Sequence, residues 1–142
     1  MAAGALFVDG DRVLLVRKTY GNRWDLPGGY VERGESPATA CQREVLEEIG
    51  VDRKPVRLLV SDWAPNEEGD KVLYVFSCGN IGADEHAIRL DGIELDLWEW
   101  VSFEQLADYV IPRLVRRITR AYEAHQNGMT LYLEHGEVVL GA

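Results

Sequence analysis

Residues 36–51 read SPATACQREVLEEIGV, and this stretch predicts a helix with an apolar face beside an acidic one. Ser36 is a suitable N-cap residue, and Pro37 suits the first helical position. Gly50 is typical of the residue at which a helix ends. We therefore expect a helix over residues 37–49. At about 100° per residue, its predicted apolar face consists of Ala38, Cys41, Val45 and Ile49.

The neighbouring face of this helix carries three carboxylates, Glu44, Glu47 and Glu48, at positions i, i+3 and i+4. Exposed like charges at these spacings destabilise a helix by a few tenths of a kcal/mol per pair, and by more when they are partly buried. A hard divalent cation such as Mg²⁺ or Mn²⁺ would remove this repulsion, because it prefers oxygen ligands. The alternative is an acidic face that is simply solvated.

The length and composition predict a single domain over residues 1–142 with an ordinary hydrophobic core. The formal net charge of -9 argues against duplex nucleic acid as the main partner, but it is compatible with a small phosphorylated ligand held by a metal ion. Cys41 and Cys78 are too few for a disulfide framework, so we expect two small core residues.

No segment approaches the roughly 20 apolar residues of a membrane span, and the first residues lack the basic leader of a signal peptide. We therefore expect a cytoplasmic protein that has no membrane partner.

Short apolar runs predict several strands separated by turn residues. The predicted strands cover residues 5–8, 13–16, 56–60, 72–76 and 96–101. The first two are expected to form a hairpin, because Asp9-Gly10 between them is a strong turn signal. Helices are expected at residues 103–109, capped by Ser102, and at residues 114–126. This mixture predicts an α/β or α+β sandwich.

Residues 129–140 predict a C-terminal β-hairpin that turns at His135-Gly136. Such a hairpin can cover a sheet edge or pair with a second subunit. We therefore expect a homodimer.

Nine residues match a known motif without a gap. The motif is Gly-x5-Glu-x7-Arg-Glu-U-x-Glu-Glu-x-Gly-U, where U is a bulky aliphatic residue, and the matching residues are Gly29, Glu35, Arg43, Glu44, Val45, Glu47, Glu48, Gly50 and Val51. This is the Nudix box, so the chain resembles the Nudix hydrolases. Leu26-Pro27-Gly28-Gly29 and Glu94 extend the resemblance beyond the box. It implies an α/β/α sandwich with a mixed β-sheet.

The resemblance implies that Mg²⁺ or Mn²⁺ is bound by Glu44, Glu47 and Glu48 together with the Gly28 carbonyl. It implies a general base among Glu44, Glu47 and Glu94. From the residues themselves, Gly28 and Gly29 permit a sharp backbone path. Arg43 is expected to organise the carboxylates from a fixed position opposite Glu35.

The activity that the resemblance implies is hydrolysis of a phosphoanhydride in a nucleoside diphosphate linked to another moiety. Nucleoside triphosphates, nucleotide sugars, ADP-ribose and dinucleoside polyphosphates all remain open as substrates. The proline typical of some ADP-ribose-cleaving relatives is shifted here, with Asn66 at its place and Pro65 before it. A Nudix-fold nucleotide-binding or regulatory module without turnover is the alternative. Isoprenoid diphosphate isomerisation would need a catalytic cysteine, and Cys41 is poorly placed for that role.

Basic and aromatic residues outside the box offer further contacts with the substrate. Arg17, Lys18 and Arg23 are placed to reach phosphates, and Trp24, Trp63 or Tyr74 could stack on a base, although a surface or core role is the more usual one for each. Trp98 and Trp100 share one side of a strand, and we expect them in the core. One helix face is expected to be solvated or interfacial; it consists of Arg113, Arg116, Arg117 and Arg120.

Overall fold

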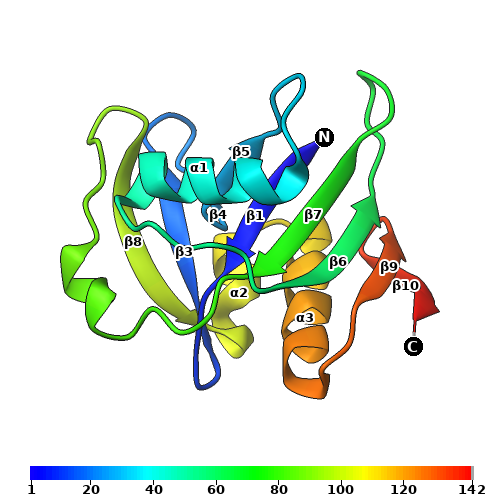
Figure 1. The fold of residues 1–142 in the computed structure, drawn as a ribbon. Helices are drawn as coiled ribbons and strands as arrows, with labels where there is room; N and C mark the ends of the chain where they lie inside the picture. Colours follow the sequence, from blue (N-terminus) through cyan, green and yellow to red (C-terminus); the bar gives the residue numbers. More distant parts are fainter. Residues whose placement is uncertain (142) are drawn as a thin grey trace.

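The protein folds into two β-sheets held between helices (Figure 1). The computed structural model describes residues 1–141. The strands are β1 Ala2–Leu6, β2 Val8–Asp9, β3 Arg12–Lys18, β4 Trp24–Asp25, β5 Gly28–Tyr30, β6 Arg57–Trp63, β7 Val72–Ser77, β8 Leu95–Ser102, β9 Leu131–Glu134 and β10 Glu137–Gly141. The α-helices are α1 Pro37–Ile49, α2 Leu106–Tyr109 and α3 Pro112–Asn127, with 3₁₀ turns η1 Gly82–Ala87 and η2 Phe103–Gln105.

The larger sheet has six strands in the order β10-β9-β6-β7-β1-β5. It is mixed, because β1 pairs with β7 and β6 with β9 in parallel, whereas the other pairs are antiparallel. In the smaller sheet, β3 pairs with β2, β4 and β8. The expected α/β/α sandwich with mixed pairing is confirmed, but its strands divide between two sheets.

The predicted hairpin over residues 5–8 and 13–16 forms only at its tip, where Val8 and Asp9 pair with Val13 and Arg12. The prediction was wrong for the preceding residues, because β1 ends at Leu6 and belongs to the larger sheet. The chain passes from one sheet to the other at Phe7, which is fully buried.

Helix α1 has the predicted bounds and caps. The Ser36 hydroxyl accepts a hydrogen bond of 3.1 Å from the Thr39 N–H. Gly50 takes the left-handed conformation, with φ of 73°. One predicted core residue was wrong: Ala38 is exposed, and Ala40 is buried in its place. The buried arc of α1 is therefore rotated toward its carboxylates.

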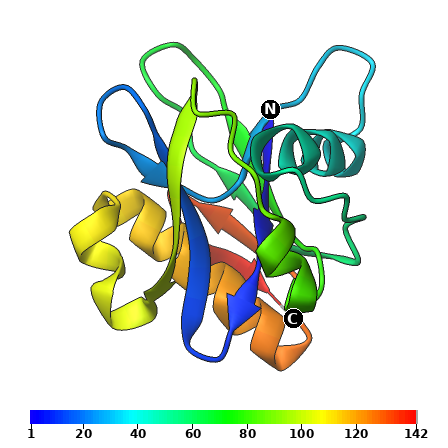
Figure 2. The same ribbon diagram turned by 90° about the vertical axis from the view of Figure 1, so that its left-hand side faces the viewer.

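The two faces of the sheets pack against different helices, as Figures 1 and 2 show, with α1 on one side and α3 on the other. Side chains alternate across β3, so Val13 and Leu15 enter the α3-side core while Leu14 and Val16 enter the α1-side core. The α1-side core also contains both cysteines and is flanked by Trp98 and Trp100, as expected.

The C-terminal third differs from expectation at two helix starts. Ser102 makes no capping hydrogen bond, and the 3₁₀ turn η2 precedes α2. Helix α3 begins at Pro112, before the expected position. The β9–β10 hairpin is confirmed, with φ of 53° at His135 and 79° at Gly136. Within residues 1–141, no helix has the length and apolar character needed to cross a bilayer.

Candidate active site

Arg43 lies on α1, at the centre of a network of carboxylates that belong to this helix and to the residues just before it. Its Nε and Nη2 donate to the two oxygens of Glu35 at 2.7 and 2.9 Å. Its Nη1 donates to Glu44 Oε1 at 2.8 Å and, more weakly, to Glu47 Oε2 at 3.3 Å. The guanidinium beside Glu35 lowers the pKa of that carboxyl to about 2. The geometry matches the organising arrangement that the sequence predicted for Arg43.

Glu44 is held against the backbone of Gly29. Its side chain is only 19% exposed, although it carries a carboxylate. A Cβ atom at Gly29 would lie 2.5 Å from the Glu44 carboxyl carbon, closer than side-chain contacts allow. A side chain at position 29 would therefore displace the Glu44 carboxyl group, which occupies that space.

Glu48 is held in the same way by the adjacent residue. The Gly28 N–H donates to Glu48 Oε1 at 2.6 Å. Gly28 has φ of 155°, and a Cβ there would lie 2.2 Å from the Ala3 carbonyl oxygen. Burial raises the pKa of Glu48 to about 8, and the charge of Glu44 adds to this, while the bond from Gly28 opposes it. Two neighbouring carboxyl groups are thus kept half-buried, which disfavours the charged form of Glu48.

Glu44 and Glu48 open onto a cleft of about 380 Å³. We call it the acidic cleft, defined by its carboxylates Glu32, Glu44, Glu48 and Glu94. Glu47 does not line the cleft. Its side chain is 59% exposed and lies against Arg43. The structure thus brings Glu94 together with two of the three helix carboxylates.

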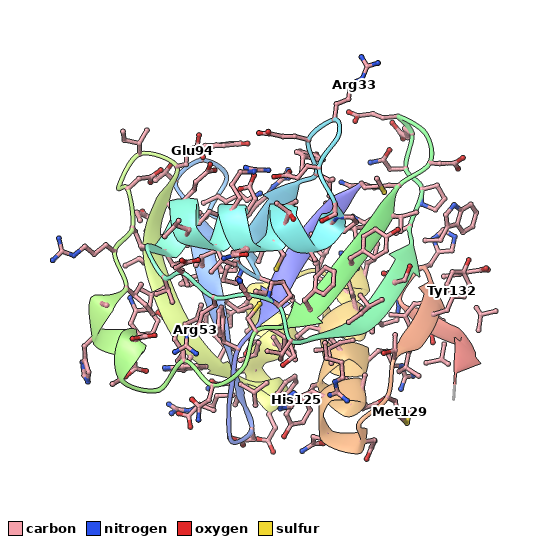
Figure 3. The ribbon with its side chains drawn as sticks, in the orientation of Figure 1. Arg33, Arg53, Glu94, His125, Met129 and Tyr132 are labelled. Atoms are coloured by element: carbon pink, nitrogen blue, oxygen red, sulfur yellow. The ribbon has the colours of Figure 1, made fainter. Side chains whose placement is uncertain are left out.

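Glu94 belongs to the loop before β8, along the upper edge of the molecule in Figure 3. Its N–H donates to Asp91 Oδ1 at 3.0 Å, and its carbonyl accepts from the Thr19 N–H at 2.8 Å. Asp91 also accepts N–H bonds from Ile93 and Leu95, and these bonds hold its pKa below the ordinary value. Asp91 therefore fixes the loop that carries Glu94.

The oxygen donors of the acidic cleft suit a hard divalent cation, although the carboxylates do not form a complete coordination site. Within residues 1–141, no three Asp, Glu, His or Cys side chains are grouped closely enough to hold a metal ion. Mg²⁺ usually takes one or two carboxylates and completes its shell with water and substrate phosphates. Glu44 and Glu48 fit this requirement, since a cation would offset the repulsion between two desolvated carboxylates.

A second cavity, of about 570 Å³, adjoins the acidic cleft. Five cationic side chains line it, with Asp25 as the one lining carboxylate among the described residues, and we call it the basic cavity. These cations are Lys18, Arg23, Lys71, Arg113 and Arg117. Trp24 and Tyr109 form an edge-to-face pair in its wall, with ring centroids 5.2 Å apart. Lys18 and Tyr30 line both the acidic cleft and the basic cavity, so the two are contiguous.

Arg117 corrects the prediction of a solvated arginine face on α3. It is 5% exposed, and its Nε donates at 2.6 Å to Asp62, which is fully buried. Asp62 also accepts the Gly136 N–H at 3.0 Å. Arg116 and Arg120 are partly exposed and face Glu137. Helical periodicity grouped these arginines correctly, but it could not reveal a partner 55 residues away in the chain.

The side chains of Arg17 and Lys18, two of the predicted phosphate contacts, point in different directions, and a β-bulge lies between these residues. Arg17 turns to Asp96, with hydrogen bonds of 2.9 and 2.7 Å, whereas Lys18 faces the cavities. Successive residues of a strand point to opposite faces, and the bulge bends the strand further at this point.

The other predicted substrate contacts divide in the same manner. Arg23 and Trp24 line the basic cavity, and Tyr74 lines a smaller pocket between the cavity and the cleft. Trp63 instead packs against His135, with ring centroids 5.5 Å apart.

Sequence reasoning missed Asp25, Lys71 and Tyr109, which also line the basic cavity. Lys71 lies just before a predicted strand and Asp25 just before Leu26-Pro27, but neither position carries a local signal of its role. Tyr109 ends a helix that was correctly expected.

The comparisons with known proteins agree with this geometry. The NUDIX domain model matches residues 1–123. An RNA pyrophosphohydrolase of Rickettsia rickettsii is 26% identical over 141 residues, covering 85% of this chain and 88% of that protein.

Solved structures show the same fold. The MutT protein from Methanosarcina mazei Go1 has a TM-score of 0.71 at 25% identity, over 89% of this chain and 93% of that one. A UDP-X diphosphatase has a TM-score of 0.74 at 24% identity, over 94% of this chain and 66% of that one.

Proposed function

The chain belongs to the Nudix family and is a Nudix hydrolase acting on nucleoside diphosphate-linked compounds, and we propose that the acidic cleft is where it cleaves the phosphoanhydride bond. One observation carries this proposal. Gly28 donates an N–H bond to Glu48, and Gly29 leaves the space that Glu44 occupies. Both carboxyl groups therefore lie half-buried at the wall of a single cleft, at an energetic cost that a purely structural helix would not need.

In this proposal, Glu44 and Glu48 bind Mg²⁺ or Mn²⁺ together with the Gly28 carbonyl, and Glu47 completes the set from the rim. When bound, the cation neutralises phosphate charge and lowers the pKa of the attacking water. Arg43 holds Glu44 in place through its 2.8 Å hydrogen bond, so it acts as a positioning residue.

Glu94 is our first candidate for the general base. Its backbone is fixed on both sides by Asp91 and Thr19, and its side chain lines the cleft. Among residues 1–141, that side chain has no hydrogen-bond or ion-pair partner. Glu44 and Glu47 are the other candidates, but Arg43 already engages both.

The test is product release from a panel of nucleoside triphosphates, ADP-ribose, nucleotide sugars and dinucleoside polyphosphates, each with Mg²⁺ or Mn²⁺. We expect Glu48→Gln and Glu94→Gln to lose most of the turnover, and Glu68→Gln to keep it. Glu68 is an exposed glutamate that lines neither the cleft nor the cavity, so it is a matched control.

A folded, metal-binding parent without turnover on any substrate would instead favour the nucleotide-binding or regulatory module. Equal loss in the Glu68→Gln control would show that the effect does not depend on the acidic cleft.

We also propose that residues 1–142 form one domain and that the chain is a homodimer paired through β10. This strand lies at the end of the larger sheet and exposes Val138 and Val139, at 44% and 51%. Light scattering that gives the mass of a single chain at micromolar concentration would exclude the dimer.

A further inference from the structure

Two contiguous cavities of opposite charge lie beside each other in a protein whose net charge is -9. The acidic cleft has four carboxylates and one cation, Lys18, whereas the basic cavity has five cations and one carboxylate, Asp25. Five cations gathered against so acidic a background form a local field that attracts anions.

We propose that the basic cavity binds phosphates of the substrate that lie beyond the bond being cleaved. The preferred substrates then carry three or more phosphates in a chain, as nucleoside and dinucleoside polyphosphates do, and are not nucleotide sugars or ADP-ribose. This inference rests on the proposed function, because it names the substrate class of that same site.

Four of the five cations are available to a ligand. Among residues 1–141, no carboxylate lies within 4.0 Å of the charged nitrogens of Lys18, Arg23, Lys71 or Arg113. Outside the cavity, Arg12, Arg17 and Arg53 each have a carboxylate partner, whereas four other cations have none among the described residues; these are Arg33, Lys54, Arg57 and Arg89. Arg23 and Arg113 are exposed and Lys18 and Lys71 are partly buried, and a bound anion would offset the repulsion among these like charges.

The fifth cation, Arg117, presents a preorganised edge. Among the described residues, Arg117 bonds to protein through its Nε alone, which donates to Asp62. No fully buried side-chain nitrogen in this part of the chain lacks a hydrogen-bond partner. Its terminal nitrogens therefore keep a small accessible surface, and Arg117 lines the cavity. A guanidinium fixed in this way suits a phosphate, which accepts two parallel N–H bonds.

Lys18 connects the two cavities. It lines the acidic cleft, the basic cavity and the smaller pocket between them. That smaller pocket is also lined by Gly28, Gly29 and Arg117. A phosphate chain that starts between Glu44 and Glu48 can thus run along Lys18 toward Lys71 and Arg113. An uncharged sugar in the same position would leave the cations without a partner.

The experiment compares Arg113→Gln and Lys71→Gln with Lys54→Gln. Lys54 is exposed and lines none of the cavities, so its variant removes the same charge elsewhere. Hydrolysis is measured with diadenosine di-, tri- and tetraphosphate and with ADP-ribose. We expect KM for the tri- and tetraphosphates to rise about tenfold in both cavity variants, because each loses a charge-assisted contact, and KM for diadenosine diphosphate and ADP-ribose to rise much less. Lys54→Gln should keep kcat and KM for all four substrates within about twofold of the parent.

A second readout does not depend on turnover. Calorimetry in EDTA measures the binding of inorganic tripolyphosphate, which can then use only the protein's own cations. We expect binding to the parent and to Lys54→Gln, and at least fivefold weaker binding to Arg113→Gln and Lys71→Gln. Equal binding by all four proteins, or equal losses for diphosphates and longer chains, would overturn the inference.

The two readouts separate this inference from the proposed function. If hydrolysis is lost in Glu48→Gln but unchanged in Arg113→Gln and Lys71→Gln, the hydrolase site is supported and the polyphosphate subsite is rejected. Tripolyphosphate binding that requires Arg113 and Lys71 in a protein without turnover would support the anion subsite and reject the hydrolase site.

Discussion

Glu48→Gln should remove a pH dependence from the stability of the metal-free protein. The Glu48 carboxyl has an ordinary pKa of 4.5 in the unfolded chain and a pKa of about 8 in the fold. Between these values the folded state keeps a proton that the unfolded state releases, so stability is full below pH 4.5 and is lost as pH rises through 8. At about 1.36 kcal/mol per pKa unit, the complete loss is of the order of 5 kcal/mol.

The assay is urea unfolding in EDTA at pH 5, 7 and 9. Gln can accept the Gly28 N–H bond in place of Glu48, so the variant keeps the contact and loses only the titration. We expect the parent to lose several kcal/mol more than Glu48→Gln between pH 5 and 9. Glu47→Gln, at a neighbouring position that is 59% exposed, should follow the parent.

Adding Mn²⁺ at pH 9 should restore stability to the parent and not to Glu48→Gln, because a cation binds the charged carboxylate that the variant lacks. Parallel pH profiles for the parent and Glu48→Gln without metal would refute the reasoning, since Glu48 would then be as well solvated in the fold as in the unfolded chain.

Three further predictions concern the groups around the two cavities. Gly29→Ala should lower kcat about 10- to 100-fold in steady-state assays, because the new Cβ would displace Glu44 from 2.5 Å away. Arg43→Lys should lower activity by a similar factor and should lower Tm in calorimetry, because an ammonium cannot reproduce the two parallel bonds of the guanidinium. Asp62→Asn should cost about 3–5 kcal/mol in denaturant unfolding, because it leaves the Arg117 charge buried without its partner. A second change, Arg117→Met, should then recover part of that loss, and purely additive losses would contradict the assigned pair.

Helix α1 could be predicted almost completely, because its signals are local. Ser36, Pro37 and Gly50 define its ends, and the apolar spacing defines most of its buried side. Ala38 was wrong because periodicity gives the width of an apolar face but not its exact direction. That direction is set by how the helix rests on β1 and β5, strands that lie earlier in the chain.

The sheets were less predictable for the same reason. The strand predicted over residues 5–8 overlaps β1 only at Ala5 and Leu6, and the neighbours of β1, antiparallel β5 and parallel β7, are distant in sequence. The turn signal at Asp9-Gly10 correctly predicts a tip and cannot show how far the hairpin extends.

The two cavities show the same contrast. The motif located Glu44, Glu48 and the glycines of the acidic cleft, since these lie within one short stretch and carry an unusual charge pattern. The basic cavity draws single residues from β3, from the loop before β7 and from α3, with Lys71 and Arg117 as examples. No short pattern joins such residues, so only the folded chain brings them together.

The last hairpin bears on how this protein should be divided for expression or for domain exchange. The family match ends at residue 123, inside α3, which runs to Asn127. Beyond it, β9 adds the buried side chains Leu131 and Leu133 to the core. Gly136 holds the aspartate that fixes Arg117. A chain cut at the family boundary would keep every residue of the Nudix box and every residue that lines the two cavities, yet it would lose these core side chains and the N–H donor to Asp62, so we expect the shortened chain to be unstable.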